Sequence, residues 1–226
     1  MNLTDKRCIV TGSTGALGSA VVHRLLSAGA QVAVINRSSV ATSVAITIGN
    51  VDLADPQAAK QAIDAAASRL GGLYSLVNIA GAFRWETLAD GDVATWDLLY
   101  AANLKTAVCA CKAALPHLLK NGSGRIVSIG ASAVTKAAAG MGAYAASKAG
   151  LAKLTEAFSE EVKGNGITVN AVLPSIIDTP ANRVEMPKAD VSKWVTPLAI
   201  ADLIAFLLSD EAADITGALI PITGRT

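Results

Sequence analysis

Short, nearly continuous apolar runs alternate with longer alanine-rich stretches from one end of the chain to the other. The apolar runs are rich in β-branched side chains and are bounded by glycine, asparagine, aspartate or serine. Runs of this kind predict strands that are buried on both faces, and the alanine-rich stretches between them predict helices. We expect strands at residues 7–10, 31–35, 75–78, 125–129, 167–172 and 218–222, with a further strand within 44–51.

The alternation of strands and helices predicts the fold class. Each helix carries the chain back to the same edge of the sheet, so successive strands run parallel. We therefore predict an α/β fold, a single doubly wound Rossmann-type domain with a mostly parallel sheet of about seven strands and helices on both faces. No linker, repeat or low-complexity segment divides the sequence, so one domain is expected over residues 1–226.

Composition and charge narrow the class of partner. The chain of 226 residues is 52% hydrophobic and 16% charged, with a net charge of +1. These values exclude a disordered chain and give no basic surface for nucleic acid or an anionic membrane. No apolar run is expected to be long enough to cross a bilayer, because Asp202 interrupts the best candidate, residues 198–208. Residues 1–6 lead directly into the first strand, so a cytoplasmic protein without a signal peptide is expected.

The cysteines and histidines are too scattered to suggest a metal site. Cys8, Cys109 and Cys111 form neither a Cys-x-x-Cys motif nor a zinc spacing, and His23 and His117 are isolated. Reduced thiols in the core of a cytosolic protein are therefore expected, and no metal is predicted.

The first predicted strand leads into a glycine-rich turn at residues 11–18 (TGSTGALG) and then into a helix expected over 19–27. Strand, glycine turn and helix form the arrangement that binds a pyrophosphate at a helix N-terminus, although a tight turn without a ligand is the alternative. The first glycine permits the turn, the second lets the backbone approach the phosphates, and the third lets the helix pack closely on the sheet. The predicted cofactor-binding residues here are Gly12, Ser13, Thr14, Gly15, Ala16, Leu17 and Gly18.

The end of the second strand indicates which dinucleotide binds. A carboxylate there would bind the ribose of NAD, whereas a cation would accept the 2′-phosphate of NADP. This chain has Asn36 and Arg37, so NADP(H) is preferred over NAD(H), with a solvated Arg37 as the alternative. Asp52 and Leu53, after the third strand, could border the adenine, while Asp55 is suited to cap a helix.

Tyr144 and Lys148 are the strongest catalytic candidates among the residues. They lie four positions apart in a predicted helix, so their side chains point the same way. A cation beside a phenol favours the phenolate, which lowers the pKa of the tyrosine and makes it a usable proton donor or acceptor near neutrality. The alternative is a half-buried tyrosine and a solvated lysine on an ordinary helix.

The order of these motifs resembles the short-chain dehydrogenase/reductase family along nearly the whole chain. The glycine turn is followed by residues 78–81 (NIAG), by Asn103, by the Tyr144 and Lys148 pair, and by residues 170–174 (NAVLP). Each signal is weak alone, but their fixed order is specific.

The resemblance implies a role for each matching residue. Tyr144 would be the general acid that protonates the oxygen or nitrogen of the double bond whose carbon receives the hydride. Lys148 would lower its pKa and bind the nicotinamide ribose, and Asn103 would hold a water of the proton relay. The resemblance also implies a homotetramer or homodimer. It adds Asn78, Ala80, Gly81, Pro174, Ile176, Ile177 and Thr179 to the expected cofactor site.

The chain departs from the family pattern in several places. Ala16 stands at the position of the second family glycine, residues 78–81 lack a second asparagine, and Ser175 replaces a glycine. The family's catalytic serine normally lies thirteen positions before the tyrosine, which is Ala131 here. Ser132 is adjacent and could substitute after a shift of one residue, so it is a fourth catalytic candidate.

Within the family, the chain resembles the quinonoid dihydropteridine reductases. The resemblance lies in residues 15–19 (GALGS), residues 178–183 (DTPANR), the stretch from Met186 to Pro197, and the missing serine. A quinonoid dihydropterin is an imine-like acceptor that needs only a hydride and a proton. Arg37 does not fit the NADH preference of that group. For Trp194, which lies in the stretch from Met186 to Pro197, the alternative to a role in the substrate site is packing in the core.

The leading hypothesis is thus an NADP(H)-dependent oxidoreductase acting on a small carbonyl or imine-like acceptor. One alternative is a 3-oxoacyl or general ketone reductase that uses Ser132 as the missing donor. Another is a catalytically weak dinucleotide-binding sensor or scaffold, although such a protein would not need Tyr144, Lys148 and Asn103.

Overall fold

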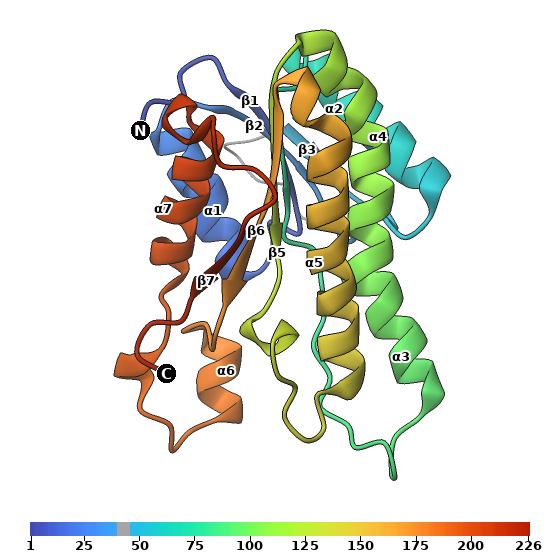
Figure 1. Cartoon of the computed structure of the whole chain (residues 1–226), viewed down its shortest axis with the longest axis vertical. Coiled ribbons are helices and arrows are strands. Elements are labelled where there is room, and N and C mark those ends of the chain that lie inside the picture. Colours follow the sequence, from blue (N-terminus) through green and yellow to red (C-terminus); the bar gives the residue numbers. More distant parts are fainter. Residues whose placement is uncertain (40–45) are drawn as a thin grey trace.

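A parallel sheet of seven strands forms the centre of the molecule, in the order β3-β2-β1-β4-β5-β6-β7 (Figure 1). The computed structural model describes residues 1–39 and 46–226. All neighbouring strand pairs are parallel. The predicted doubly wound α/β fold is therefore confirmed.

The strands lie close to the predicted ranges because each one is buried on both faces. The predicted strand within 44–51 is present, although Val44 and Ala45 lie outside the described residues. The sixth strand runs on to Pro174, because its pairing with the last strand continues to that residue. The strands are β1 (Arg7–Thr11), β2 (Gln31–Ile35), β3 (Ile46–Ile48), β4 (Ser75–Asn78), β5 (Gly124–Ile129), β6 (Ile167–Pro174) and β7 (Leu219–Ile222).

Helices cover both faces of the sheet. On one face lie α2 (Pro56–Leu70), α4 (Thr106–Asn121) and α5 (Gly142–Val162), and on the other lie α1 (Ala16–Ser27) and α7 (Pro197–Leu208) (Figure 1). Successive strand residues point to opposite faces, so Ile9 and Val10 enter different apolar clusters. This alternation explains why each strand is apolar throughout.

One long helical segment runs along the edge of the molecule. It comprises α3 (Val93–Tyr100), a π-helical turn (Ala101–Lys105) and α4. By length and composition alone the segment is long enough and apolar enough to span a membrane, so the expectation that no such run exists is wrong. The charged residues of this segment, Asp97, Lys105, Lys112 and Lys120, lie seven or eight positions apart. On its inner side the segment contributes Cys111, Ala114 and Leu118 to the core.

The remaining elements are short. They are four 3-10 turns, Ser132–Val134, Lys163–Asn165, Val191–Lys193 and Asp210–Ala212, and one helix, α6 (Pro180–Glu185). The three cysteines are free and buried, as expected. Burial raises the pKa of Cys8 to about 11 and that of Cys111 to about 12, so both thiols stay protonated near neutrality.

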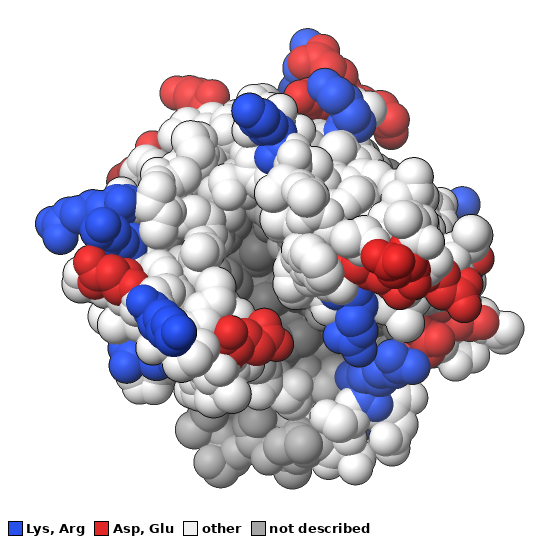
Figure 2. All heavy atoms as spheres, turned by 90° about the horizontal axis from the view of Figure 1, so that it is seen from below, with Lys and Arg blue, Asp and Glu red and all other residues white. Residues whose placement is uncertain are grey.

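The carboxyl ends of all seven strands meet at one edge of the sheet, because the strands are parallel. The glycine turn and the loops that follow β2, β4, β5 and β6 therefore gather at this end. Figure 2 views the molecule from this side and shows a hollow in the middle of the face. Ligands of open α/β sheets bind in such a crevice beyond the carboxyl ends of the strands.

Candidate active site

The glycine turn after β1 is shaped by two close backbone contacts. Gly12 has a φ of +72°, and a Cβ atom there would lie 2.7 Å from the backbone nitrogen of Ala80. Gly18 packs against the carbonyl of Gly12, where a Cβ atom would clash. Gly15 is different, since nothing lies within 4 Å of its Cβ position. Two glycines thus close the turn sterically, and the third leaves open space at the start of α1.

Helix α1 begins earlier than predicted, at Ala16 rather than at Ser19. Gly15 is the N-cap residue with an extended backbone, so Gly18 lies inside the first turn of the helix and not in the loop before it. The first backbone N–H groups of α1 therefore lie directly after the open position at Gly15, which is the geometry that suits a phosphate.

Asn36 holds the glycine turn by hydrogen bonds to Ser13. It is buried, and its Oδ1 accepts hydrogen bonds from the backbone N–H and the hydroxyl of Ser13, at 2.8 and 3.1 Å. The side chain of Asn36 is thus occupied inside the protein and holds the turn in place. Arg37, the next residue, is exposed at the same edge and forms no ion pair with any residue in the described ranges.

The residues after β3 divide between a helix cap and the core. Asp55 caps α2, because its side chain accepts a hydrogen bond from the N–H of Ala58 at 2.7 Å. This is the capping role predicted for it. Asp52 is exposed and accepts the N–H of Ala54 at 3.0 Å. Leu53 is buried in the core, so only its backbone is free to face a ligand.

The end of β4 is tied to the end of β1. The hydroxyl of Thr11 accepts hydrogen bonds from the N–H groups of Ile79 and Ala80, at 3.1 and 3.3 Å. Asn78 is buried, and its Nδ2 donates to the hydroxyl of Ser128 at 3.2 Å. Asn78 therefore joins β4 to β5 inside the sheet through its side chain.

Asn103 lies in the π-helical turn and connects two loops of the site. It is 1% exposed. Its Oδ1 accepts the N–H of Ala82 at 2.8 Å, and its Nδ2 donates to the carbonyl of Ala82 and to the hydroxyl of Ser147, both at 3.0 Å. The Ser147 hydroxyl donates to the carbonyl of Tyr144 at 2.7 Å. A continuous chain of hydrogen bonds thus runs from the loop after β4 to the main-chain carbonyl of Tyr144.

Lys148 is almost fully buried in α5, one turn after Tyr144. Only 6% of the residue is exposed, and its ammonium donates to the carbonyl of Ile129 at 2.7 Å. Burial lowers the pKa of Lys148 to about 8. A lysine with this pKa can gain or lose a proton near neutral pH.

Tyr144 behaves differently from the prediction. Its ring meets the ring of Phe83 edge to face, with 4.9 Å between centroids. Burial raises the pKa of Tyr144 to about 12. The expectation that Lys148 lowers this pKa is therefore wrong for the chain by itself, because desolvation dominates and the ammonium is directed at the Ile129 carbonyl. In this state Tyr144 keeps its proton and is suited to donate it.

The loop after β5 carries the two candidate positions for a hydroxyl donor. Ala131 is buried, whereas Ser132 is partly exposed and begins a 3-10 turn. The carbonyl of Ser132 accepts the N–H of Thr135 at 3.3 Å, but its hydroxyl has no hydrogen-bond partner among the described residues. Ser132 is thus free to bind a ligand if its hydroxyl is directed into the hollow.

The segment after β6 is held in place by its neighbours. Ile176 accepts the N–H of Val195 at 3.0 Å, Ile177 pairs with Val195, and Thr179 caps α6. Pro174, which ends β6, is buried. Trp194 is also buried, which agrees with a packing role. Residues 174–179 thus form a fixed wall of the site.

Sequence reasoning missed three contributors to the site, Thr11, Ser147 and Phe83. Thr11 begins the glycine turn and Ser147 lies between Tyr144 and Lys148, but nothing in the spacing indicated that their hydroxyls bridge distant loops. Across the described ranges, no group of three or more His, Cys, Asp or Glu side chains is arranged to hold a metal ion.

Replacing Lys148 by methionine should reveal the cost of the buried ammonium. The folded pKa is about 8, below the usual 10.5, so the unfolded chain binds more protons between these values. The unfolding free energy of the wild type should therefore rise relative to that of the variant between pH 8 and 10.5, by up to about 3 kcal/mol. Urea unfolding of both proteins across this range is the measurement. Lys112→Met, at an exposed position of α4, is the control, and a pH-independent difference for Lys148→Met would contradict the assignment.

The fold and the site together define a class of protein. A parallel Rossmann sheet, a glycine turn at a helix N-terminus, and a Tyr144 and Lys148 pair at the same edge are the parts of a nicotinamide-dependent oxidoreductase. A model of the short chain dehydrogenase family matches residues 6–190. The chain belongs to this family.

Individual relatives agree with the family assignment. The chain is 32% identical to 2-(S)-hydroxypropyl-CoM dehydrogenase 3 of Xanthobacter autotrophicus, covering 98% of this chain and 96% of the relative. It is 30% identical to the 3-oxoacyl-acyl-carrier-protein reductase FabG of Vibrio cholerae, covering 99% and 98%. The protein is therefore an oxidoreductase of the short-chain dehydrogenase type, a family that uses NAD or NADP.

Solved structures show the same fold. A mutant short-chain dehydrogenase/reductase from Serratia marcescens superimposes with a TM-score of 0.89 at 29% identity, covering 100% of this chain and 99% of the other. A short-chain type dehydrogenase/reductase from Mycobacterium ulcerans gives a TM-score of 0.91 over 100% and 90% of the two chains. At 22% identity, the second likeness concerns the fold alone.

Proposed function

We propose that this protein is an NADP(H)-dependent reductase of a small carbonyl or imine-like acceptor, with Tyr144 as the proton donor. The observation that carries the proposal is the placement of Tyr144 and the buried Lys148 one turn apart in α5, where Asn103 and Ser147 link the backbone of Ala82 to the main-chain carbonyl of Tyr144. When bound, the nicotinamide supplies a hydride to the acceptor carbon. The phenol of Tyr144 supplies the proton to the oxygen or nitrogen, so the double bond is reduced and NADPH is oxidised.

The protonation states of the site support the direction of reduction. Because burial raises the pKa of Tyr144 to about 12, the phenol carries its proton at neutral pH. Lys148, with a pKa of about 8, is suited to return a proton to Tyr144 after each cycle. The proposed role of Asn103 is to hold a water behind Lys148, and its side chain also keeps the loop at Ala82 in position.

The glycine turn fits a dinucleotide. Gly15 leaves open space at the N-terminus of α1, and Gly12 brings the turn into close contact with Ala80 at the end of β4. We assign the pyrophosphate to this turn and the 2′-phosphate to Arg37. Lys148 would hold the nicotinamide ribose, and residues 174–179 would lie beside the nicotinamide.

The buried methyl group at Ala131 favours an imine-like acceptor. A ketone gains from a second hydrogen-bond donor beside the tyrosine, and Ala131 cannot supply one. A quinonoid dihydropterin needs only a hydride and one proton, and the resemblance of residues 178–183 to the dihydropteridine reductases agrees with it. Ketone reduction is the second candidate, because the Ser132 hydroxyl, which has no hydrogen-bond partner within residues 1–39 and 46–226, lies next to Ala131 and the relatives include a 3-oxoacyl reductase.

An NADPH-oxidation screen separates the two candidates. The acceptors are quinonoid dihydropterin, an acetoacetyl thioester, small diketones and quinones, followed by absorbance at 340 nm. For a ketone acceptor, Ala131→Ser should raise kcat/KM and Ser132→Ala should lower it. For a quinonoid dihydropterin both changes should be nearly silent, and a large loss in Ser132→Ala would reject that substrate. NADPH binding without turnover of any acceptor would instead support a sensor or scaffold.

Arg37 should determine the choice of cofactor. A charge-assisted contact to the 2′-phosphate contributes roughly 1.5–3 kcal/mol, so its loss should weaken NADPH binding by about one to two orders of magnitude. Arg37→Asp adds repulsion and should reverse the preference towards NADH. Fluorescence titration with both cofactors is the measurement, and Arg69→Asp, which makes the same charge change at an exposed position of α2, is the control. Equal affinity of the wild type for NADH and NADPH would overturn the assignment.

A homodimer or homotetramer is proposed on the outer side of α3 and α4. Large apolar residues are exposed along these helices, among them Leu98, Tyr100 and Val108. Light scattering coupled to size exclusion measures the number of subunits, and a monomer at micromolar concentration would contradict the proposal.

A further inference from the structure

Three aromatic side chains contact the short segment that leads into Tyr144. Phe83 meets the ring of Tyr144 itself. The indole of Trp85 covers Gly140, where a Cβ atom would lie 2.8 Å from its Cδ2, and the ring of Trp96 lies 3.4 Å from the Cβ position of Gly142. The chain has only nine Phe, Tyr and Trp residues in all, so four of them gather at the start of α5.

The loop that carries Phe83 and Trp85 is fixed at both ends. At one end the backbone of Ala82 is held by Asn103, at 2.8 and 3.0 Å. At the other end the N–H of Glu86 donates to the carbonyl of Gly140 at 2.8 Å. The two aromatic rings are therefore held against the start of α5 and do not depend on a ligand for their position.

Gly140 is shaped to receive the indole. Its φ is +75°, and it has no side chain to push Trp85 away. The contact covers only part of the ring, because Trp85 is 62% exposed, and Phe83 is 42% exposed. Rings this exposed contribute little to the core, and their position beside the proton donor makes a direct role in acceptor binding the better explanation.

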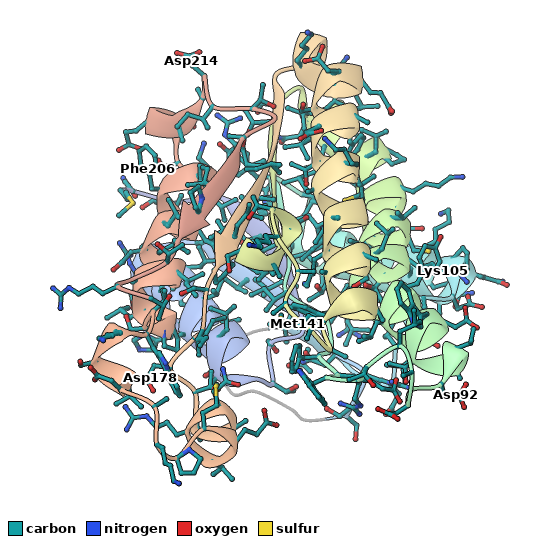
Figure 3. The ribbon with its side chains drawn as sticks, turned by 60° about the horizontal axis from the view of Figure 1, so that its bottom comes forward. Asp92, Lys105, Met141, Asp178, Phe206 and Asp214 are labelled. Carbon is teal, nitrogen blue, oxygen red and sulfur yellow. The ribbon has the colours of Figure 1, made fainter. Side chains whose placement is uncertain are left out.

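The site has a second wall across the hollow. Figure 3 labels Met141 at the start of α5 and Asp178 on the segment before α6. That segment is fixed by the pairing of Ile177 with Val195 and by the N–H of Asp178, which donates to the carbonyl of Val195 at 2.8 Å. This segment and the aromatic loop are thus both held in place by hydrogen bonds within the protein.

We propose that Trp85, seated on Gly140, determines which acceptors reach Tyr144, by stacking on small flat ones and obstructing bulky ones. This proposal rests on the reductase function proposed above and assigns its substrate specificity to a named side chain. An indole has only two rotatable bonds, and here the backbone is hydrogen-bonded at both ends of the loop while the ring rests on Gly140, so the orientations open to the ring are restricted. A small planar acceptor gains a stacking surface beside Phe83 and Trp85, whereas an acceptor joined to a large carrier loses space.

The test compares two acceptors that have the same reacting group and differ in size. Ethyl acetoacetate and acetoacetyl-coenzyme A are both 3-oxo compounds, so the chemistry at Tyr144 is the same. In Trp85→Ala the ratio of kcat/KM for the small ester to that for the thioester should fall by about tenfold or more. Leu88→Ala removes another exposed side chain of the same loop and should leave the ratio unchanged. A ratio that does not change in Trp85→Ala would overturn the proposal.

Gly140→Ala provides a second variant with the same expected direction. The new methyl group would displace the indole, so the ratio should fall here too, although the positive φ also strains the loop. Gly142→Ala is its counterpart, because its Cβ would make only an ordinary contact with Trp96 and the ratio should be preserved. Thermal melts show which variants remain folded.

If the wild type turns over neither acceptor, that result counts against a reductase function for 3-oxo compounds. A binding measurement then tests the role of Trp85 separately. Menadione, a flat bicyclic quinone, is titrated against tryptophan emission. Saturable quenching should be clearly smaller in Trp85→Phe than in Trp96→Phe, because Trp194 is buried and each variant leaves one exposed tryptophan to report binding. Quenching that is identical in Trp85→Phe and the wild type, or no quenching at all, would overturn the role of Trp85.

Discussion

Replacement of Tyr144 by phenylalanine is expected to lower turnover by roughly 10²–10⁴-fold, the usual contribution of a positioned general acid. The variant loses one hydroxyl and keeps the ring that meets Phe83, so the unfolding free energy should change by no more than about 1 kcal/mol. Cofactor binding should persist, because the glycine turn, Arg37 and Lys148 are unchanged. Steady-state kinetics, a cofactor titration and a thermal melt measure the three quantities.

Lys148→Ala is the companion variant. It should reduce kcat to a similar extent and also weaken cofactor binding, since it removes both the proton relay and the proposed ribose contact. The two losses should not add in the double variant, because the residues act as one unit. Undiminished turnover in Tyr144→Phe would mean that the chemistry takes place elsewhere in the protein.

Gly18→Ala is expected to destabilise the fold strongly. The new methyl group would clash with the carbonyl of Gly12 and lie 2.7 Å from the Cα of Ser13, and backbone atoms cannot move aside as side chains can. Overpacking typically costs about 1–3 kcal/mol, so a loss of at least about 3 kcal/mol is expected here. For a chain of this size that corresponds to a melting temperature lower by roughly 6–12 °C.

Gly15→Ala is the matched control within the same turn. Nothing lies within 4 Å of its Cβ position, and its φ of −80° suits any residue. Stability should therefore stay within about 1 kcal/mol of the wild type. Cofactor affinity should fall, because the methyl group enters the space assigned to the pyrophosphate. Equal melting temperatures for Gly18→Ala and the wild type would show that the turn can widen, contrary to the packing seen here.

The fold was predictable because it depends on patterns that are local in the sequence. Buried parallel strands must be apolar throughout, and the ranges of β1, β2, β4 and β5 follow from that requirement alone. The closeness of Tyr144 and Lys148 was predictable for a similar reason, since a spacing of four fixes the relative direction of two side chains in a helix. Neither inference needs any knowledge of how distant parts of the chain meet.

The orientation of polar residues at the strand ends was not predictable in this way. Asn36 and Asn78 occupy positions where a ligand contact was expected, yet both side chains turn inward to hydrogen-bond the protein. The side chain of a residue at the end of a strand can face either the hollow or the core, and the residue type does not reveal which. The raised pKa of Tyr144 was missed for a related reason, because it depends on burial by Phe83 and other residues far away in the sequence.

The aromatic loop shows the same limit most clearly. Trp85 and Gly140 are far apart in the chain, and neither belongs to a periodic pattern that would associate them. Only the hydrogen bonds at Ala82 and Glu86, which bring residues 82–86 onto the start of α5, create the contact. Features that rest on such long-range contacts require the three-dimensional structure.

The π-helical turn at Ala101–Lys105 makes this region sensitive to chain length. A π turn accommodates one residue more than an α-helical turn would in the same span. Deleting a single residue there would let α3 and α4 join as one continuous α-helix with their faces nearly unchanged, because the wide turn already absorbs the extra residue. Trp96 would stay beside Gly142, but the wide turn from which Asn103 reaches the backbone of Ala82 would be lost. We therefore expect natural variants that retain the Asn103 contact to conserve the number of residues between Trp96 and Thr106.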